Sequence, residues 1–463
     1  MYAVDTERYG RRDFLRLGAA AAAGVAATGY ALRTGAPIVR AAEPEASAPS
    51  GTLSVAIWGD TVDYKTLHTA INKYMTLYPA VKVTVREGNC GADYAACKTL
   101  IAGGTMLDVF VPGIWNYNAM VDAGVLTDLT PYMKSGDFNL GDYNSTITGQ
   151  MKSLKDGHLY GLPMGFNIQS IFYNKDMFDK AKLAYPPMDG NYTWNDLRAW
   201  AKKLTLDANG NTPASSHFNA RKVKQWGFFT WAMIEQQAHL DSILLAHGGS
   251  LMTYPSRQRC NLESPNTIKG LQFIQDLMWK DHSTLTPQAN QEELGVDRFV
   301  AGHVAMEQGS HEQVGLVAAR NPSMRLGIAP LPKGPYGPAD CIQIHIWSIF
   351  NRAQNKDLAW HFVKWISGPG SGTEMGLVPH YKDYAYGPDF LKGRGEPAGL
   401  KQAQLDPLKW KLTIVPTSFN QKNDGIAGQD GFGPALTNIM ANKQTAADAV
   451  RGVSQKVNAI MQQ

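Results

Sequence analysis

Between residues 52 and 113, the spacing of apolar residues switches several times between the alternation typical of strands and the spacing typical of helices. Leu67, Ile71 and Tyr74 recur at helical spacing, whereas Val81 and Val83 belong to a strictly alternating run. The pattern predicts alternating elements in this order: strand 52–59, helix 63–79, strand 81–88, helix 92–104 and strand 106–113. Strands that alternate with helices form a parallel sheet, so an α/β fold is expected.

A second α/β set follows, with a strand and a helix predicted within 168–181. Thr193 and Asp196 are spaced as a capping box and predict where the next helix begins. Further amphipathic helices are predicted over 193–205, 266–281 and 356–367. Five tryptophans of these helices are expected to pack in the interior rather than to contact a ligand: Trp194, Trp200, Trp279, Trp360 and Trp365.

The first 41 residues are typical of an export signal. Arg11 and Arg12 precede Phe14 and Leu15, and an Ala/Gly-rich stretch follows before small residues near Ala41. The paired arginines indicate the twin-arginine type, an address and not an anchor. A transmembrane anchor is the alternative, but alanine and glycine supply too little apolar character. We expect export to the periplasm or to the outer face of the cytoplasmic membrane, with a linker over 42–51.

Charge and length narrow the class of protein. The formal charge is +4 over 463 residues. The export signal contributes about +3 of this charge, which argues against nucleic acid as a partner. The remaining ~420 residues exceed one ordinary domain, so two or three lobes are expected.

Four cysteines suit an oxidising compartment. Cys90 and Cys97 stand close enough in the sequence to close a small disulfide loop, and Cys260 and Cys341 would then form a second one. The alternative is four buried thiols. The cysteine spacing contains no C-x-x-C and gives no zinc pattern.

Catalytic motifs are missing from the sequence: it has no nucleophile elbow, P-loop, dinucleotide fingerprint or H-E-x-x-H. His303 and Glu307 are four residues apart, but flanking glycines and alternation favour a strand over a metal-binding helix. We therefore expect no catalytic residue, no metal and no cofactor.

Polar and aromatic side chains follow several predicted strands. Open parallel sheets bind ligands outside the carboxyl ends of their strands. Aromatic faces together with amide and carboxylate acceptors suit a polyhydroxylated ligand. The candidate ligand-binding residues at these positions are Trp58, Asp60, Trp115, Asn116, Asn167, Glu307, Ser310 and His311.

The chain resembles the extracellular solute-binding proteins of carbohydrate-type ABC importers, the family that includes maltose-binding protein. The specific stretches are DGHLYGLP, YNKDMF, AGHVAMEQGSH and GIAPLPKG, within a resemblance that covers roughly 52–378. It implies an α/β, two-lobed periplasmic-binding-protein fold of type II, with a ligand cleft between hinge-linked lobes. The implied lobes are 52–163 plus 292–336 and 168–288 plus 344–463, with hinge segments near 162–167, 288–292 and 335–343.

The resemblance also adds site residues. Trp231 and Glu235 match a segment that lines the second lobe in relatives, and His311 stands where the family usually has a tryptophan. Trp347 and Trp410 are further candidates in the later part of the chain. Asp108 matches a residue that is structural in the family.

The implied function is capture of a sugar by a monomer that delivers it to a permease, without turnover. Two alternatives stay open: the same fold with a non-sugar solute such as a polyamine, an amino-acid derivative or iron, or a secreted carbohydrate-active enzyme.

Overall fold

The structure is a computed structural model of the chain. It describes residues 48–57, 61–88, 94–133, 138–143, 145–234, 237–253, 259–293, 295–310, 316–317, 320–368, 399, 403–404, 407, 413–416 and 431–462. No helix in this part of the chain has both the length and the apolar character needed to cross a membrane. The predicted export signal lies outside the described residues.

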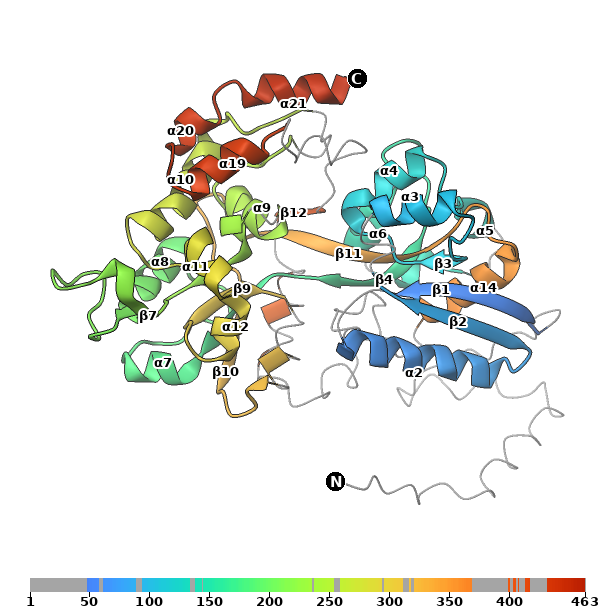
Figure 1. Cartoon of the computed structure of the whole chain (residues 1–463), viewed down its shortest axis with the longest axis horizontal. Coiled ribbons are helices and arrows are strands. Elements are labelled where there is room, and N and C mark those ends of the chain that lie inside the picture. The colour runs from blue at the N-terminus through green and yellow to red at the C-terminus, as the bar shows by residue number, and fades with distance from the viewer. Residues whose placement is uncertain are drawn as a thin grey trace, which may run out of the picture. The chain divides into compact units, whose positions relative to one another are not determined.

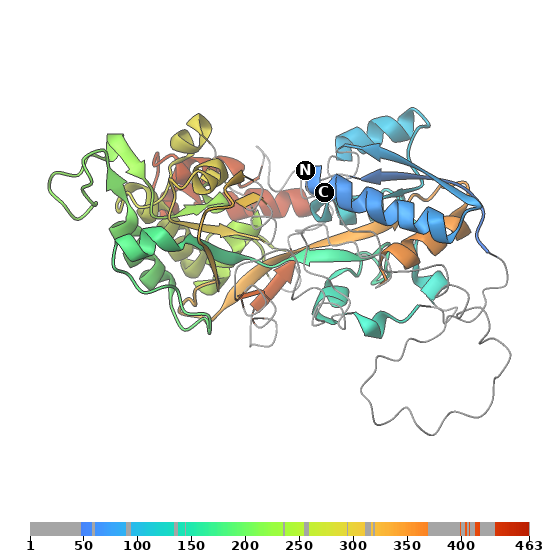
Figure 2. The ribbon, with the colours of Figure 1, turned by 90° about the horizontal axis from the view of Figure 1, so that it is seen from below.

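The first sheet contains six strands: β1 (Gly51–Ile57), β2 (Val81–Glu87), β3 (Val109–Phe110), β4 (Leu162–Asn167), β11 (Ala339–Ile349) and β12 (Thr413–Pro416). β2, β1 and β3 are parallel, as the alternating pattern predicts. β11 adds to β3 in the antiparallel direction, so the complete sheet is mixed. β4 also pairs with β11, and the two strands lie side by side in both views (Figure 1 and Figure 2).

The helices that accompany this sheet are α2 (Thr61–Leu77), α3 (Tyr94–Ala102), α4 (Ile114–Asp122), α5 (Thr130–Met133), η2 (Leu140–Asp142), α6 (Ser145–Gln150) and α14 (Lys356–Ile366). Figure 1 shows α2 on one side of β1 and β2, with α3 and α4 on the other. Leu67, Ile71 and Tyr74 of α2 are buried in the same cluster as Leu53 and Val55 of β1. The helical spacing therefore directs one face of α2 onto the sheet.

The second sheet contains β5 (Ser170–Asn174), β8 (Phe229–Thr230), β9 (Met306–Gly309) and β10 (Leu326–Pro330), in the order β10-β5-β9-β8. β5 is antiparallel to both neighbours, whereas β8 and β9 are parallel. β6 (Leu206–Asp207) and β7 (Val223–Gln225) form a separate pair.

The helices of this part are α7 (Lys175–Lys180), α8 (Trp194–Leu204), η3 (Ala220–Lys222), η4 (Trp231–Ile234), α9 (Gln237–Ala246), α10 (Pro265–Trp279), α11 (Pro287–Glu292), α12 (Gly295–Val300), α19 (Gly433–Met440), α20 (Ala446–Ala449) and α21 (Val453–Gln462). The capping box predicted for Thr193 and Asp196 is present at α8. It satisfies two backbone donors at the first turn.

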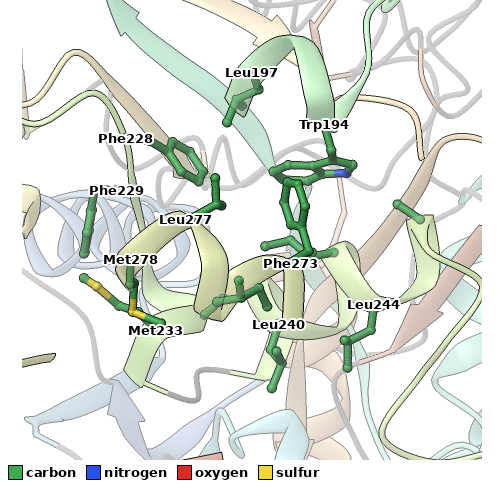
Figure 3. Close-up of a cluster of buried hydrophobic side chains, with 14 of the residues drawn as sticks. Trp194, Leu197, Phe228, Phe229, Met233, Leu240, Leu244, Phe273, Leu277 and Met278 are labelled. Atoms are coloured by element: carbon green, nitrogen blue, oxygen red, sulfur yellow. The ribbon is translucent and has the colours of Figure 1, made fainter. Parts of the chain in front are cut away.

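Two large hydrophobic clusters hold the described elements together. One contains β1, β3, β4, most of β11 and α14, and we call it the first core. The other contains β5 and β8–β10, and we call it the second core. Its helices are α7, α8, η4, α9, α10, α12, α19, α20 and α21. Figure 3 shows part of the second core, where Trp194, Phe228 and Phe273 meet. All five tryptophans predicted to pack are in one of these cores or against it.

Two segments pack with the opposite core from the one expected. Residues 292–336 were predicted in the first lobe, but Phe299, Val304 and Ile328 are buried in the second core. The physical reason is strand pairing, because β9 and β10 both hydrogen-bond to β5. Conversely, Ile346 and Phe362, predicted with the second lobe, are buried in the first core.

Among the described residues, the chain changes core between β4 and β5 and again at the start of β11, and it changes once more between Ile366 of the first core and Ala403 of the second. Ile168 belongs to the first core and Ile171 to the second, and Ala339 belongs to the second and Ile342 to the first. The crossing predicted near 288–292 is wrong, because Leu285, Ala289 and Phe299 all pack in the second core.

The predicted Cys260–Cys341 disulfide is also wrong. Cys260 carries a free thiol in the second core, where its backbone N–H donates to Asn458 Oδ1 at 2.8 Å. Cys341 lies within β11 and packs against Ala238 of α9, in a separate small cluster. Cys90 lies outside the described residues, so the Cys90–Cys97 disulfide stays a prediction.

Candidate functional site

The carboxyl ends of β8, β9 and β10 lie together with the start of β5 along one side of the second sheet. Gly309 at the end of β9 pairs with Ser170 at the start of β5, and Pro330 at the end of β10 pairs with the same residue. β8 runs parallel to β9, so Trp231 and Ser310 follow two neighbouring strand ends. We call this the second-sheet edge. It brings together two of the predicted site residues.

A buried amide fixes the strands at this edge. Gln308 Oε1 accepts from Thr230 Oγ1 at 2.7 Å, and its Nε2 donates to His239 O of α9 at 3.3 Å. All three residues are buried. Burial also lowers the pKa of His239 to about 3, so its imidazole is neutral at physiological pH. The network ties β8 and β9 to the first turn of α9.

Gln169 and Asp340 complete the second-sheet edge. Asp340 Oδ2 accepts from the Gln169 backbone N–H at 2.9 Å, and Oδ1 lies 3.1 Å from Ser242 Oγ of α9. The Gln169 side chain is buried, and neither its Oε1 nor its Nε2 has a hydrogen-bond partner among the described residues. A buried amide without a partner costs free energy. Its donors and acceptor are suited to a ligand rich in hydroxyl groups.

The corresponding edge of the first sheet follows β1 and β3. Because these strands are parallel and paired, residues 58–60 and 111–116 follow strand ends that lie side by side. Trp115 is half-buried and Asn116 is buried in the first turn of α4. A Cβ on Gly113 would lie 2.6 Å from the Trp115 ring, so glycine leaves the space that the indole occupies.

β11 connects the two edges. It is antiparallel to β3, pairing Ser348 with Phe110, and its first residues lie beside Gln169 and α9. Following β11 backwards from Ser348 therefore leads from the carboxyl end of β3 to Asp340. The second-sheet edge and the corresponding edge of the first sheet therefore lie at different points along β11.

Several predicted residues lie outside the described part of the chain. These are Trp58, Asp60, Glu235, His311 and Trp410. Asn167 closes β4 opposite Gln343, but its side chain is outside the described set. Glu307 lies in β9 itself and is fully buried, and its pairing with Phe229 places it one residue before the network of Gln308.

Trp347 is a core residue and not a ligand contact. It is 0 % exposed, and its ring packs edge-on against Phe362 of α14 with 6.4 Å between ring centroids. Although it stands close to the end of β11, its side chain is buried in the first core, which explains the error. Asp108 is structural, as expected, because its Oδ2 accepts from Ser54 N at 2.9 Å and from Ser54 Oγ at 2.6 Å.

Three polar residues at the second-sheet edge were not selected from the sequence as site residues: His239, Ser242 and Asp340. The usable signal was the single carboxylate in the strand of 339–349. His303 precedes β9 and Glu307 lies in it, which agrees with the strand predicted there. Among the described residues, no group of three or more His, Cys, Asp or Glu side chains could hold a metal ion.

Comparisons with known proteins agree on one class. The profile of the family described as bacterial extracellular solute-binding proteins matches residues 58–373. Three Brucella proteins named as binding proteins match, and the one from Brucella abortus (strain 2308) is 25% identical over 274 residues, or 58% of this chain. The chain spans 60% of the length of these relatives. The maltotriose-binding protein of Pyrococcus abyssi is 22% identical over 393 residues, covering 80% of this chain and 76% of that protein.

Solved structures give the same fold over most of the chain. The ABC substrate-binding protein Lmo0181 from Listeria monocytogenes, in complex with cycloalternan, has a TM-score of 0.75 at 20% identity, covering 89% of this chain and 100% of that one. The GacH receptor of Streptomyces glaucescens, solved unliganded and with acarbose, has a TM-score of 0.70 at 16% identity, with coverages of 89% and 99%. The fold is therefore the α/β two-lobed fold of binding proteins.

Proposed function

Because the chain belongs to the family of bacterial extracellular solute-binding proteins, we propose that it captures a sugar or oligosaccharide outside the cytoplasmic membrane. It then delivers this solute, as a monomer, to the permease subunits of an ABC importer. Binding draws the two lobes together, with the ligand contacts favouring the closed state.

The observation that carries the sugar assignment is that similar proteins bind oligosaccharides. The names of relatives and neighbours include maltotriose, cycloalternan and acarbose. The composition of the two edges supports it, since Trp115 and Trp231 offer ring faces, and Gln169 offers an amide without a protein partner. Sugar rings stack their C–H faces on aromatic rings, and their hydroxyls pair with amides.

A thermal-shift screen of residues 42–463 tests the function. A ligand at a hundred times its Kd stabilises the fold by about 2.7 kcal/mol. We expect stabilisation by an oligosaccharide and no product after prolonged incubation. Stabilisation by polyamines or amino acids alone would replace the sugar assignment with one of these ligands. Product formed from a polysaccharide would indicate an enzyme.

We expect Trp115→Ala and Trp231→Ala each to weaken saccharide binding roughly tenfold, because each removes one stacking surface. Isothermal titration with the saccharide found by the screen measures this. Trp279→Phe is the matched control, since Trp279 packs against the second core and donates to Met440 O at 2.9 Å. Equal losses in the control and the two test variants would mean that the tryptophans act only through packing.

A phosphorylated polyol is a second candidate ligand. The sn-glycerol-3-phosphate-binding periplasmic protein of Escherichia coli (strain K12) is 27% identical over 172 residues, or 36% of this chain. This likeness is short, so sn-glycerol 3-phosphate enters the screen as one further compound. Stabilisation by it, with none by its dephosphorylated form, would favour this candidate.

Export is proposed to use the twin-arginine route, which accepts folded cargo. Arg11 and Arg12 carry this proposal. Replacing both with lysine is expected to leave the protein in the cytoplasm, as cell fractionation would show. Export that continues unchanged in the double variant would assign the signal to another route.

A further inference from the structure

We infer that Asp340 is a positioning residue whose protonation state decides how α9 and the crossing segment 168–169 are held at the start of β11. Asp340 is buried at the point where the chain changes core. The inference concerns the fold at this crossing and does not depend on which solute the protein binds.

Asp340 contacts two other parts of the chain. Its Oδ2 accepts from the backbone N–H of Gln169, which separates β4 from β5. Its Oδ1 lies 3.1 Å from Ser242 Oγ, in the middle of α9. The next residue strengthens the second contact, because Cys341 N donates to the same Ser242 Oγ at 3.0 Å. One carboxyl group therefore joins the crossing at 168–169 and the crossing at the start of β11 to α9.

If Asp340 is ionised, the single hydroxyl hydrogen of Ser242 faces two acceptors and can bond to only one of them. Ser242 Oγ is also 2.7 Å from Ala238 O, one helical turn earlier. A hydroxyl has one hydrogen and two lone pairs, so it donates to only one acceptor at a time. With Asp340 ionised, Ser242 Oγ–H must serve either Ala238 O or Asp340 Oδ1.

A neutral Asp340 satisfies every group in this cluster. Its own O–H then donates to Ser242 Oγ, while Ser242 Oγ–H donates to Ala238 O and Cys341 N–H donates to the second lone pair. Oδ2 keeps the hydrogen bond from Gln169. Loss of the proton from Asp340 thus forces a choice on Ser242 and changes how α9 is attached to β11.

The surroundings favour the neutral form. Burial raises the pKa of Asp340 to about 7, against the lowering effect of hydrogen bonds from Gln169, Ser242 and Cys341. The other titratable residues on α9, β9 and β11 are His239 and Asp241, Glu307, and Cys341 and His345, in that order. Burial lowers the pKa of His345 to about 4, so both of these histidines are neutral above pH 5. β12, which pairs Ile414 with Asp340, contains no titratable side chain.

Asparagine is the informative substitution because it reproduces the neutral acid. In Asp340→Asn, the side-chain oxygen can accept from Gln169 N, and the amide N–H can donate to Ser242 Oγ. The variant should therefore hold α9 in the neutral arrangement at every pH. Ser242→Ala is the companion variant, since it removes the hydroxyl on which the two arrangements differ.

The first test is infrared spectroscopy of protein labelled with carbon-13 at the aspartate carboxyl group. The wild-type spectrum should contain a protonated-carboxyl C=O band at pH 5.5 that disappears by pH 8.5 and is missing from Asp340→Asn. A wild-type spectrum without this band throughout that range would overturn the inference.

The second test is hydrogen exchange by mass spectrometry on peptides that cover 168–174 and 237–246. After correction for intrinsic exchange, protection in the wild type should change across the pH range in which the C=O band disappears, and protection in Asp340→Asn should not. Ser242→Ala should also lose the pH dependence. Identical pH profiles in wild type and Asp340→Asn would show that the carboxyl group titrates without repositioning α9. Neither test needs a ligand, so failure here is separate from failure of the sugar assignment.

Discussion

Replacing Asp340 with asparagine is expected to make the folded protein more stable above pH 7. Burial raises the pKa of Asp340 to about 7 from its ordinary value of 3.8. The carboxyl group then contributes stability that is fully present below pH 3.8 and is lost as pH rises to about 7. The loss is about 1.4 kcal/mol per pH unit, or roughly 2–3 kcal/mol between pH 5 and 7. The asparagine variant has no proton to lose.

The measured quantity is the difference in free energy of unfolding between Asp340→Asn and the wild type, from denaturant titrations at several pH values. A difference is needed because buried histidines act in the opposite direction. Burial lowers the pKa of His239 to about 3 and of His345 to about 4, so their contribution is present above pH 6.5 and is lost on acidification. Both proteins carry these histidines, and the difference should therefore rise from pH 5 to 7 and then level off.

Asp207→Asn is the matched control. Burial alone would raise the pKa of Asp207, but backbone N–H groups of Asn211, Asn219 and Asn209 donate to the carboxylate and lower the pKa to about 2. The Asp207 carboxylate is thus ionised in both folded and unfolded chains above pH 5. The difference in free energy of unfolding between Asp207→Asn and the wild type should therefore be constant. A constant difference for Asp340→Asn as well would contradict the raised pKa.

The contrast between these two aspartates shows that the ionisation state of a buried carboxyl group is hard to predict from the sequence. Both are short acidic residues next to apolar neighbours, and both are buried. Their charge depends on the number of backbone N–H groups that the fold aims at each carboxylate. For Asp207, two of the donors come from Asn209 and Asn211 in the loop that directly follows β6. For Asp340, the donor is Gln169, which is far away in the sequence, and no local pattern encodes this contact.

Local elements were predictable because their signals are local. The spacing of Leu67, Ile71 and Tyr74 fixes which face of α2 is apolar, and Thr193 with Asp196 fixes the start of α8. Assignment of segments to the two lobes was less successful, since it depends on strand pairing between distant residues. Residues 306–309 and 326–330 join β5 through hydrogen bonds that connect positions more than a hundred residues apart.

The types of residue at the candidate site could be predicted from the sequence, but only some of the individual residues could. Strand ends gave Trp115, Asn116 and Ser310, because a polar or aromatic residue after a strand is visible in the sequence. Trp347 was selected for its residue type, yet its position inside β11 buries it in the first core. Burial of that kind depends on α14, which packs against β11.

Gly227→Ala is expected to destabilise the protein by about 3 kcal/mol or more, which is the upper range for overpacking a closely packed interior. Gly227 lies between β7 and β8, and its N–H donates to Thr205 Oγ1 at 2.9 Å. A Cβ there would lie 1.9 Å from Ala201 O, with two more backbone atoms of Ala201 within 2.6 Å. Backbone atoms of α8 have no rotamer by which to withdraw, so β8 and α8 would have to separate.

Denaturant midpoints of Gly227→Ala and Gly149→Ala provide the measurement and its control. Gly149 is exposed in α6 and has no heavy atom within 4 Å of a built Cβ, so alanine there should stabilise by up to about 1 kcal/mol through helix propensity. A Gly227→Ala protein as stable as the wild type would mean that β8 is not held against α8. Since β8 leads directly into Trp231, the same variant should also lose saccharide affinity wherever it remains folded.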